Sequence, residues 1–177
     1  MVIERDQVKQ KESSLRRQLL FTGVVFRQEK KMAKEKRFIF LSEDFYQAYP
    51  SAQYPEMEQK KTRPYIQVIV EISEVKFAVP LRSDIHHPHV LWTDKENHCG
   101  VDFSKAVVIA DDTFVDMERK PHLRQNEFDA LRGKDFKIKQ KMEKYIKKYK
   151  QAKENPQDPI NGTLLKYSTL QYFEEYL

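Results

Sequence analysis

The sequence is poor in cysteine and glycine and has no long apolar run. Its 177 residues include one cysteine, Cys99, and 4 glycines. A single cysteine excludes an internal disulfide and a cysteine-rich zinc site, and it favours a reducing compartment, so we expect a cytoplasmic protein. No stretch approaches the roughly 18 consecutive apolar residues of a membrane-spanning helix, so no membrane partner is expected. No glycine-rich phosphate loop is present, which makes a small-molecule enzyme a distant hypothesis.

Basic charge is concentrated in two segments. Lys and Arg number 32 against 27 Asp and Glu, a net charge of +5. Residues 1–35 carry nine basic and five acidic side chains, and residues 132–153 carry ten basic and two acidic ones. The second segment is either the solvated face of a helix or a stripe that faces phosphates, and the charge pattern leaves both interpretations open.

Two regions are expected. Residues 1–35 form a basic N-terminal appendage without clear periodicity, which is either disordered or upstream of the true start, since Met32 is a second plausible start. Residues 36–177 form one domain. Its strand patterns come first and its helices last, which predicts an α+β fold with an antiparallel sheet, flanked by a long basic helix and a C-terminal helix.

The clearest local pattern is a β-hairpin. Ile66–Ile72 and Val75–Val79 alternate apolar and polar residues around Ser73-Glu74. A two-residue turn sets Tyr65 opposite Arg82 and brings Arg63 to the same end of the hairpin as Arg82 and Ser83.

Other elements are assigned from shorter signals. Ser42 is expected to cap a helix that ends near Pro50. Short strands are expected at 90–93, 105–110 and 113–115, with a turn at Gly100. A helix over 134–154 buries an apolar stripe, and Lys137, Lys141, Lys144 and Lys148 flank that stripe. The last helix is expected to be capped at Asn161 or Thr163.

A group of polar residues at or just beyond one end of the hairpin has the chemistry of a phosphodiester site. Arginine suits phosphate oxygens because its planar fork donates two hydrogen bonds. Histidine titrates near neutrality, so His87 is a candidate acid or base. Arg63, Arg82, Ser83 and His87 are therefore candidate catalytic residues for RNA transesterification. The alternative is that Arg63 pairs with a nearby Glu and Ser83 only caps a turn. Three histidines within 86–89 are too crowded for a metal site, so no metal or cofactor is expected.

Four strings carry a family resemblance. They are residues 63–65, residues 77–87 (FAVPLRSDIHH) and residues 100–106 (GVDFSKA), followed by residues 164–173 (LLKYSTLQYF). Together they resemble toxins of type III toxin–antitoxin systems in the ToxN/AbiQ superfamily, most closely the TenpN group. The resemblance runs from about Phe38 to Leu177.

The resemblance implies a fold and a function. The fold is a twisted, partly closed antiparallel β-barrel like that of MazF and Kid, flanked by helices. The function is metal-independent endoribonuclease cleavage of cellular or phage mRNA, which leaves a 2′,3′-cyclic phosphate and a 5′-hydroxyl. A small repeat RNA antitoxin, which the toxin processes itself, inhibits it in a hetero-oligomeric protein–RNA assembly. Such systems act in phage defence by abortive infection.

Individual residues match the family unevenly. Ser83 matches the active-site serine of ToxN, Arg63 stands where ToxN has a lysine, and Arg82 where it has a threonine. Phe45 replaces a tyrosine, and His87 and Lys105 fit the TenpN-like motifs. We expect Arg63, Arg82, Ser83 and His87 to be catalytic, and Lys105 and the four helix lysines to bind RNA. The alternative of another class is a non-catalytic RNA-binding module with the same basic surface.

Overall fold

The computed structural model describes residues 37–58 and 65–177, and Phe38–Leu177 form one compact unit. The expected appendage, residues 1–35, and Arg63 lie outside the described residues. The unit is α+β, with the strands first and the long helices last, as predicted. None of the described helices is long and apolar enough to span a membrane.

The predicted hairpin is present in the predicted register. Strands β2 (Gln67–Ile72) and β3 (Val75–Arg82) pair antiparallel, with Gln67 opposite Pro80 and Ile72 opposite Val75. Ser73 and Glu74 form the turn with φ of 49° and 69°. Two positive φ angles match a turn of the mirror-image type, whose twist suits a two-residue hairpin loop. Hydrophobic alternation sets the register although neither turn residue favours this conformation.

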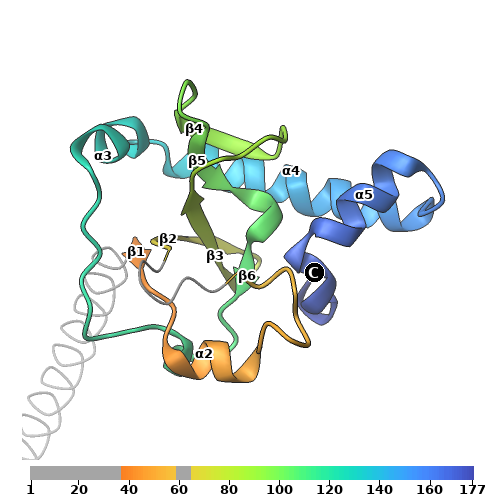
Figure 1. The fold of residues 1–177 in the computed structure, drawn as a ribbon, viewed down its shortest axis with the longest axis horizontal. Helices are drawn as coiled ribbons and strands as arrows, with labels where there is room; N and C mark the ends of the chain where they lie inside the picture. The colour runs from red at the N-terminus through yellow and green to blue at the C-terminus, as the bar shows by residue number, and fades with distance from the viewer. Residues whose placement is uncertain (1–36, 59–64) are drawn as a thin grey trace, which may run out of the picture. The chain divides into compact units, whose positions relative to one another are not determined.

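The sheet is open, so the expected partly closed barrel is wrong. Its order is β1-β2-β3-β5-β4, with β6 paired to β3 (Figure 1). β1 is Phe38–Ile39, β4 is Val90–Asp94, β5 is Cys99–Asp102 and β6 is Val107–Val108. One side of β3 is divided between two short partners, because Phe77 and Ala78 pair with β6 while Leu81 and Arg82 pair with β5. β1 and β4 therefore remain at opposite ends of the strand order.

Four α-helices accompany the sheet in the described residues. They are α2 (Glu43–Ala48), α3 (Gln125–Leu131), α4 (Asp135–Glu154) and α5 (Pro159–Tyr167). Figure 1 shows α4 running behind the sheet, with α5 folded back beside it. The apolar stripe of α4 is buried as predicted, through Ile138, Met142, Tyr145 and Tyr149. These side chains join Val68, Phe77, Val79 and Val101 of the sheet in one hydrophobic core.

Several short elements differ from the sequence-based expectation. Gly100 lies inside β5 rather than in a turn, and the chain turns earlier, where His98 has φ 52°. The expected strand at 105–110 is reduced to β6. Residues Asp112–Phe114 form a 3-10 helix, and only Val115 makes a β-bridge, with Leu41. Asp158, with Pro159 as the first helical residue, caps α5.

Candidate active site

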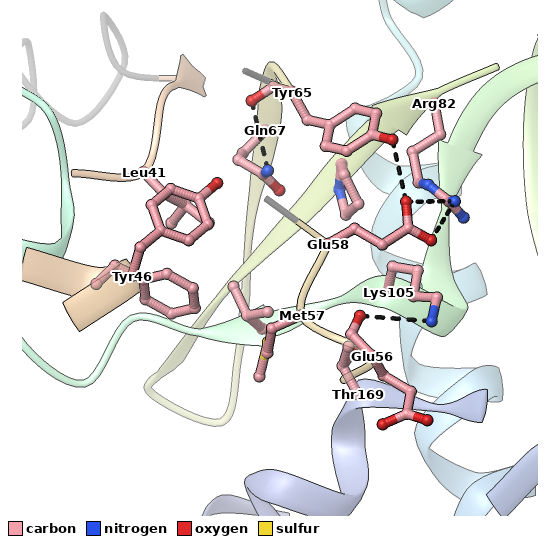
Figure 2. Close-up of a pocket in the computed structure, with 13 residues that line it drawn as sticks. Leu41, Tyr46, Glu56, Met57, Glu58, Tyr65, Gln67, Arg82, Lys105 and Thr169 are labelled. Carbon is pink, nitrogen blue, oxygen red and sulfur yellow. Dashed lines mark hydrogen bonds and ion pairs between the residues drawn. The ribbon is translucent and has the colours of Figure 1, made fainter. Parts of the chain in front are cut away.

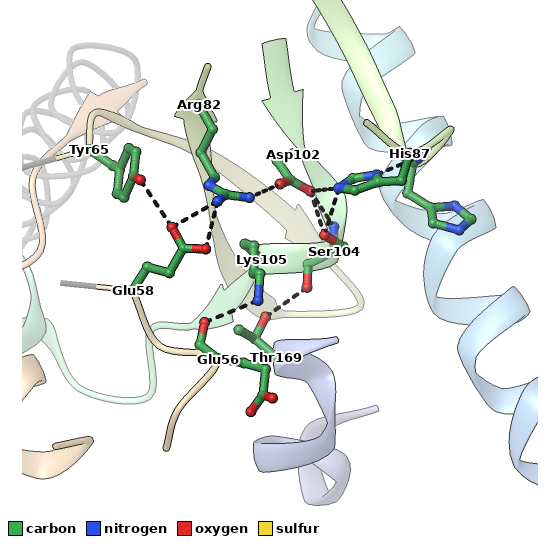
Figure 3. A network of polar contacts seen from close by, with 10 residues as sticks. Glu56, Glu58, Tyr65, Arg82, His87, Asp102, Ser104, Lys105 and Thr169 are labelled. Atoms are coloured by element: carbon green, nitrogen blue, oxygen red, sulfur yellow. Dashed lines mark hydrogen bonds and ion pairs between the residues drawn. The ribbon is translucent and has the colours of Figure 1, made fainter. Parts of the chain in front are cut away.

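Arg82 is the last residue of β3, and its guanidinium joins two carboxylates (Figure 3). Nη1 donates to Oδ2 of Asp102 at 2.6 Å, and Nη2 donates to both oxygens of Glu58 at 2.6 and 2.8 Å. Burial alone would lower the pKa of Arg82, but the two carboxylates hold it above its ordinary value. Arg82 is therefore a fixed cation at the end of the hairpin.

Asp102 is the buried centre of the site. Strand pairing places it there, because Arg82 is opposite Gly100 on β5 and Asp102 ends that strand two residues later. Its side chain is 0% exposed and accepts hydrogen bonds from the Ser104 backbone N–H at 2.9 Å and hydroxyl at 2.7 Å. Burial would raise the pKa of Asp102, but hydrogen bonds from His87, Ser104 and Arg82 outweigh it and lower the pKa.

His87 lies on the other side of Asp102 from Arg82. Its Nε2 is 3.3 Å from Oδ1 of Asp102 and 3.2 Å from the Ser104 hydroxyl. The backbone N–H of His89 donates to Nδ1 at 3.3 Å. Because a backbone N–H only donates, Nδ1 is an acceptor and the neutral imidazole carries its proton on Nε2. Asp102 thus orients the imidazole and leaves Nδ1 as the basic atom.

A pocket lies next to Arg82 and contains a second cation (Figure 2). The half-buried Lys105 lines it and donates from Nζ to the backbone carbonyl of Glu56 at 3.4 Å. Burial lowers the pKa of Lys105, and the charge of Arg82 adds to this while Glu58 opposes it. The Tyr65 hydroxyl donates to Oε2 of Glu58 at 3.0 Å, and the Tyr65 ring centroid is 5.7 Å from Cζ of Arg82. The pocket therefore combines two cations, an aromatic ring and a carboxylate.

Gln67 contributes an unsatisfied polar atom to the same pocket. The residue is 3% exposed and lines the pocket from β2. Its side-chain nitrogen donates to the Tyr65 carbonyl at 3.4 Å, while Oε1 is buried without a hydrogen-bond partner among the described residues. A buried acceptor without a donor is costly, so this atom favours a ligand or water that carries a donor.

The lysine flank of α4 borders the histidine loop. Lys141 donates from Nζ to the carbonyl of Val90 at 3.1 Å. The centroid of the His89 ring is 5.1 Å from that of Tyr145, and burial, Lys148 and His87 lower the pKa of His89 to about 4. Lys137, Lys144 and Lys148 are exposed, which is the accessibility that a phosphate-binding stripe needs.

The structure brings some of the predicted site residues together and leaves others apart. Arg82 and His87 contact the two oxygens of the same carboxylate, and Lys105 lines the pocket beside Arg82. Ser83 is exposed just beyond β3 and takes no part in the hydrogen bonds of this site within the described residues. The catalytic role predicted for Ser83 stays a prediction, as does that of Arg63, which lies outside the described residues.

Sequence reasoning missed the carboxylates. Asp102 and Ser104 lie within the 100–106 string, but a single acidic residue there gave no sign that it faces Arg82. The usable signal was the arginine itself, because a partly buried guanidinium at the end of an apolar strand requires an acidic partner. Glu58 stands in a polar loop, where its position depends wholly on tertiary structure. Phe45, which the sequence resemblance aligns with a tyrosine, is 1% exposed and belongs to the core.

Neither the search for metal ligands nor the comparison with known proteins assigns a further role to this site. Among residues 37–58 and 65–177, no group of three His, Cys, Asp or Glu side chains is placed to hold a metal ion. No protein-family model, curated protein or solved structure gives a significant match to this chain.

Proposed function

We propose that the chain is an endoribonuclease that cleaves RNA by metal-independent transesterification at the site where Asp102 joins Arg82 and His87, next to the pocket that Arg82 and Lys105 line. The observation that carries the proposal is the sharing of Asp102, which anchors Arg82 through one oxygen and orients His87 through the other. A fixed guanidinium and an imidazole on one buried carboxylate are groups that phosphodiester cleavage uses. Lys105 supplies a second positive charge in the same pocket.

The proposed chemistry assigns each group one task. The 2′-oxygen of the ribose loses its proton as it attacks the adjacent phosphorus, and the 5′-oxygen gains a proton as its bond to phosphorus breaks. His87 carries out one of these two proton transfers at Nδ1, which gives up its hydrogen bond from the His89 backbone N–H, and water carries out the other, since Asp102 holds the proton on Nε2. Arg82 and Lys105 stabilise the charge that develops on the phosphate oxygens. The products are a 2′,3′-cyclic phosphate and a 5′-hydroxyl.

The resemblance to type III toxins supplies the proposed biological setting. A small repeat RNA acts as the antitoxin, is processed by the enzyme and inhibits it in a hetero-oligomeric assembly. Cellular or phage mRNA is the substrate, and the system acts in the cytoplasm in phage defence by abortive infection. The exposed lysines of α4 support an RNA partner, because counterion release from phosphates drives such binding.

The test is cleavage of RNA in the presence of EDTA, with analysis of both new ends. We expect a cyclic phosphate and a 5′-hydroxyl, and we expect Lys105→Gln and His87→Asn each to lower the rate by about 10²-fold or more. Lys95→Gln, which removes an exposed charge from the turn after β4, is the matched control and retains the wild-type rate. Circular dichroism checks that each variant is folded. Wild-type rates in both site variants would contradict the assignment.

The exposed lysines also favour a second candidate function, a non-catalytic RNA-binding module. It predicts salt-sensitive RNA binding by the wild-type chain with no new RNA ends under any condition. The same incubation therefore separates the two functions.

A further inference from the structure

Glu58 occupies the position at which the hydrogen-bond donors of the pocket converge. Nη2 of Arg82 donates to both of its oxygens, and the Tyr65 hydroxyl donates to Oε2 (Figure 2). Lys105 lines the same pocket, and the negative charge of Glu58 acts on its pKa. Three donor-bearing side chains thus surround one carboxylate that belongs to the protein itself.

The two carboxylates on Arg82 differ in how firmly they are held. The Asp102 side chain is 0% exposed and has two further hydrogen bonds from Ser104, whereas the Glu58 side chain is 39% exposed. Ion pairs that solvent reaches contribute little stability, so the contact with Glu58 is the one that can be exchanged. Asp102 is the permanent partner of the guanidinium.

A carboxylate and a phosphate present the same hydrogen-bonding face to arginine. Both accept two parallel N–H bonds from a guanidinium edge, and both accept from a phenolic hydroxyl. Nη2 of Arg82 is already bonded to both Glu58 oxygens and Nη1 to Asp102. A phosphate at this face therefore competes directly with Glu58.

We infer that Glu58 is an internal competitor for phosphate, which fills the anion position beside Arg82, Tyr65 and Lys105 in the RNA-free protein and leaves it when a phosphodiester binds. The inference rests on the proposed function for the identity of the ligand and adds the regulation of that site. Glu58 therefore inhibits RNA binding, because it lowers the phosphate affinity of the pocket below that of an arginine–lysine site without a bound carboxylate.

Glu56 provides a matched control for the test. It lines the same pocket, and its charge also acts on the pKa of Lys105, but its carboxylate accepts from the Tyr172 hydroxyl rather than from Arg82. Glu58→Gln and Glu56→Gln each remove one negative charge without changing side-chain size. Only Glu58→Gln removes the charged competitor at Nη2.

The probe is the dinucleotide thymidylyl-(3′→5′)-thymidine, whose single phosphodiester cannot be cleaved because it lacks a 2′-hydroxyl. Its dissociation constant is measured by NMR titration of the wild-type chain and both variants, with inorganic sulfate as a second probe. We expect Glu58→Gln to bind both probes about tenfold more tightly than wild type, and Glu56→Gln to stay within about twofold of it.

Two results would overturn the inference. If both variants gained the same affinity, the effect would come from the net charge of the pocket and not from competition at Nη2. If Glu58→Gln bound the probes more weakly than wild type, Glu58 would help to bind the anion. The failure of this inference can be told apart from failure of the proposed function, which fails if the wild-type chain binds the dinucleotide yet cleaves no RNA containing 2′-hydroxyls.

Discussion

His89 is a half-buried imidazole in a positively charged setting. Its ring packs against Tyr145, and the charge of Lys148 acts on it from α4 and that of His87 from its own loop. Desolvation comes first among the causes that lower its pKa from 6.5 to about 4, and the attraction of Asp102 opposes the shift. His89 is therefore neutral at pH 7 in the folded protein.

The free energy of unfolding is expected to fall as the pH is lowered from 6.5 to 4. In this window His89 binds a proton in the unfolded chain but stays neutral in the folded chain, so acid favours unfolding. Each unit of pKa difference corresponds to about 1.4 kcal/mol, and partial exposure reduces the loss to about 1–2 kcal/mol. Urea denaturation of wild type and His89→Gln at several pH values measures the difference, and the variant is expected to lose that much less over the window.

Lys148→Gln tests the cause of this pH dependence. Removing the neighbouring positive charge raises the pKa of His89 toward its ordinary value, so the loss of stability is expected to lie between those of wild type and His89→Gln. If His89→Gln kept the full wild-type loss between pH 6.5 and 4, other groups would be responsible.

At the level of single side chains, the sequence predicts the basic residues of the candidate site but not its carboxylates. Alternation alone sets Tyr65 opposite Arg82 in the hairpin register, and the two side chains do lie together. Asp102 reaches Arg82 through pairing of β3 with β5, which are not consecutive in the chain, because the histidine loop and β4 come between them. Long-range pairing of this kind is decided by tertiary packing, which local patterns do not encode.

Among the secondary-structure elements, those with strong local signals are predicted correctly. The long apolar period indicates α4, the serine cap indicates α2, and the alternation indicates the hairpin. The errors arise where one residue type is typical of two kinds of local structure. Glycine is typical of turns, yet Gly100 lies within β5. The cap of α5 is Asp158, with Pro159 as the first helical residue, so the expected cap at Asn161 or Thr163 is wrong. Proline suits the first turn of a helix as well as a loop, so its presence alone does not decide between them.

Gly100 has a packing role in β5 rather than a conformational one. A Cβ atom at this position would lie 2.6 Å from the Leu91 carbonyl oxygen and 2.7 Å from Cγ2 of Val90. Both atoms belong to β4, which pairs with β5. A side chain here therefore forces β4 and β5 apart, and β5 is the strand that carries Asp102.

We expect Gly100→Ala to lower the free energy of unfolding by about 2 kcal/mol, because overpacking displaces backbone that is fixed by strand pairing. Urea denaturation measures the change. Gly133→Asn is the control, since Gly133 has φ +71° with open space around its Cβ position and Asn tolerates this conformation. A Gly100→Ala variant as stable as wild type would show that β4 and β5 adjust without cost.

On the scale of the whole molecule, basic charge gathers on α4, next to the histidine loop. Lys137, Lys144 and Lys148 follow the side of the helix adjoining its buried stripe, and Lys148 acts on His89, two residues from His87. Lys139, Lys147 and Lys150 are exposed at other angles around the same helix. The first set therefore lies on the side of α4 along which an RNA bound at the candidate site is expected to continue.

Replacement of Lys137, Lys144 and Lys148 by Gln is expected to weaken binding of single-stranded RNA at least tenfold at about 0.1 M salt. Removing one phosphate-binding lysine lowers the slope of log affinity against log salt by about 0.7, so the triple variant lowers it by about 2. Replacement of Lys139, Lys147 and Lys150 removes the same charge from the same helix and is expected to leave the slope within about 0.5 of wild type. Filter binding at several salt concentrations measures both quantities. Equal slopes in the two triple variants would mean that RNA responds to the net charge of α4 and contacts neither side in particular.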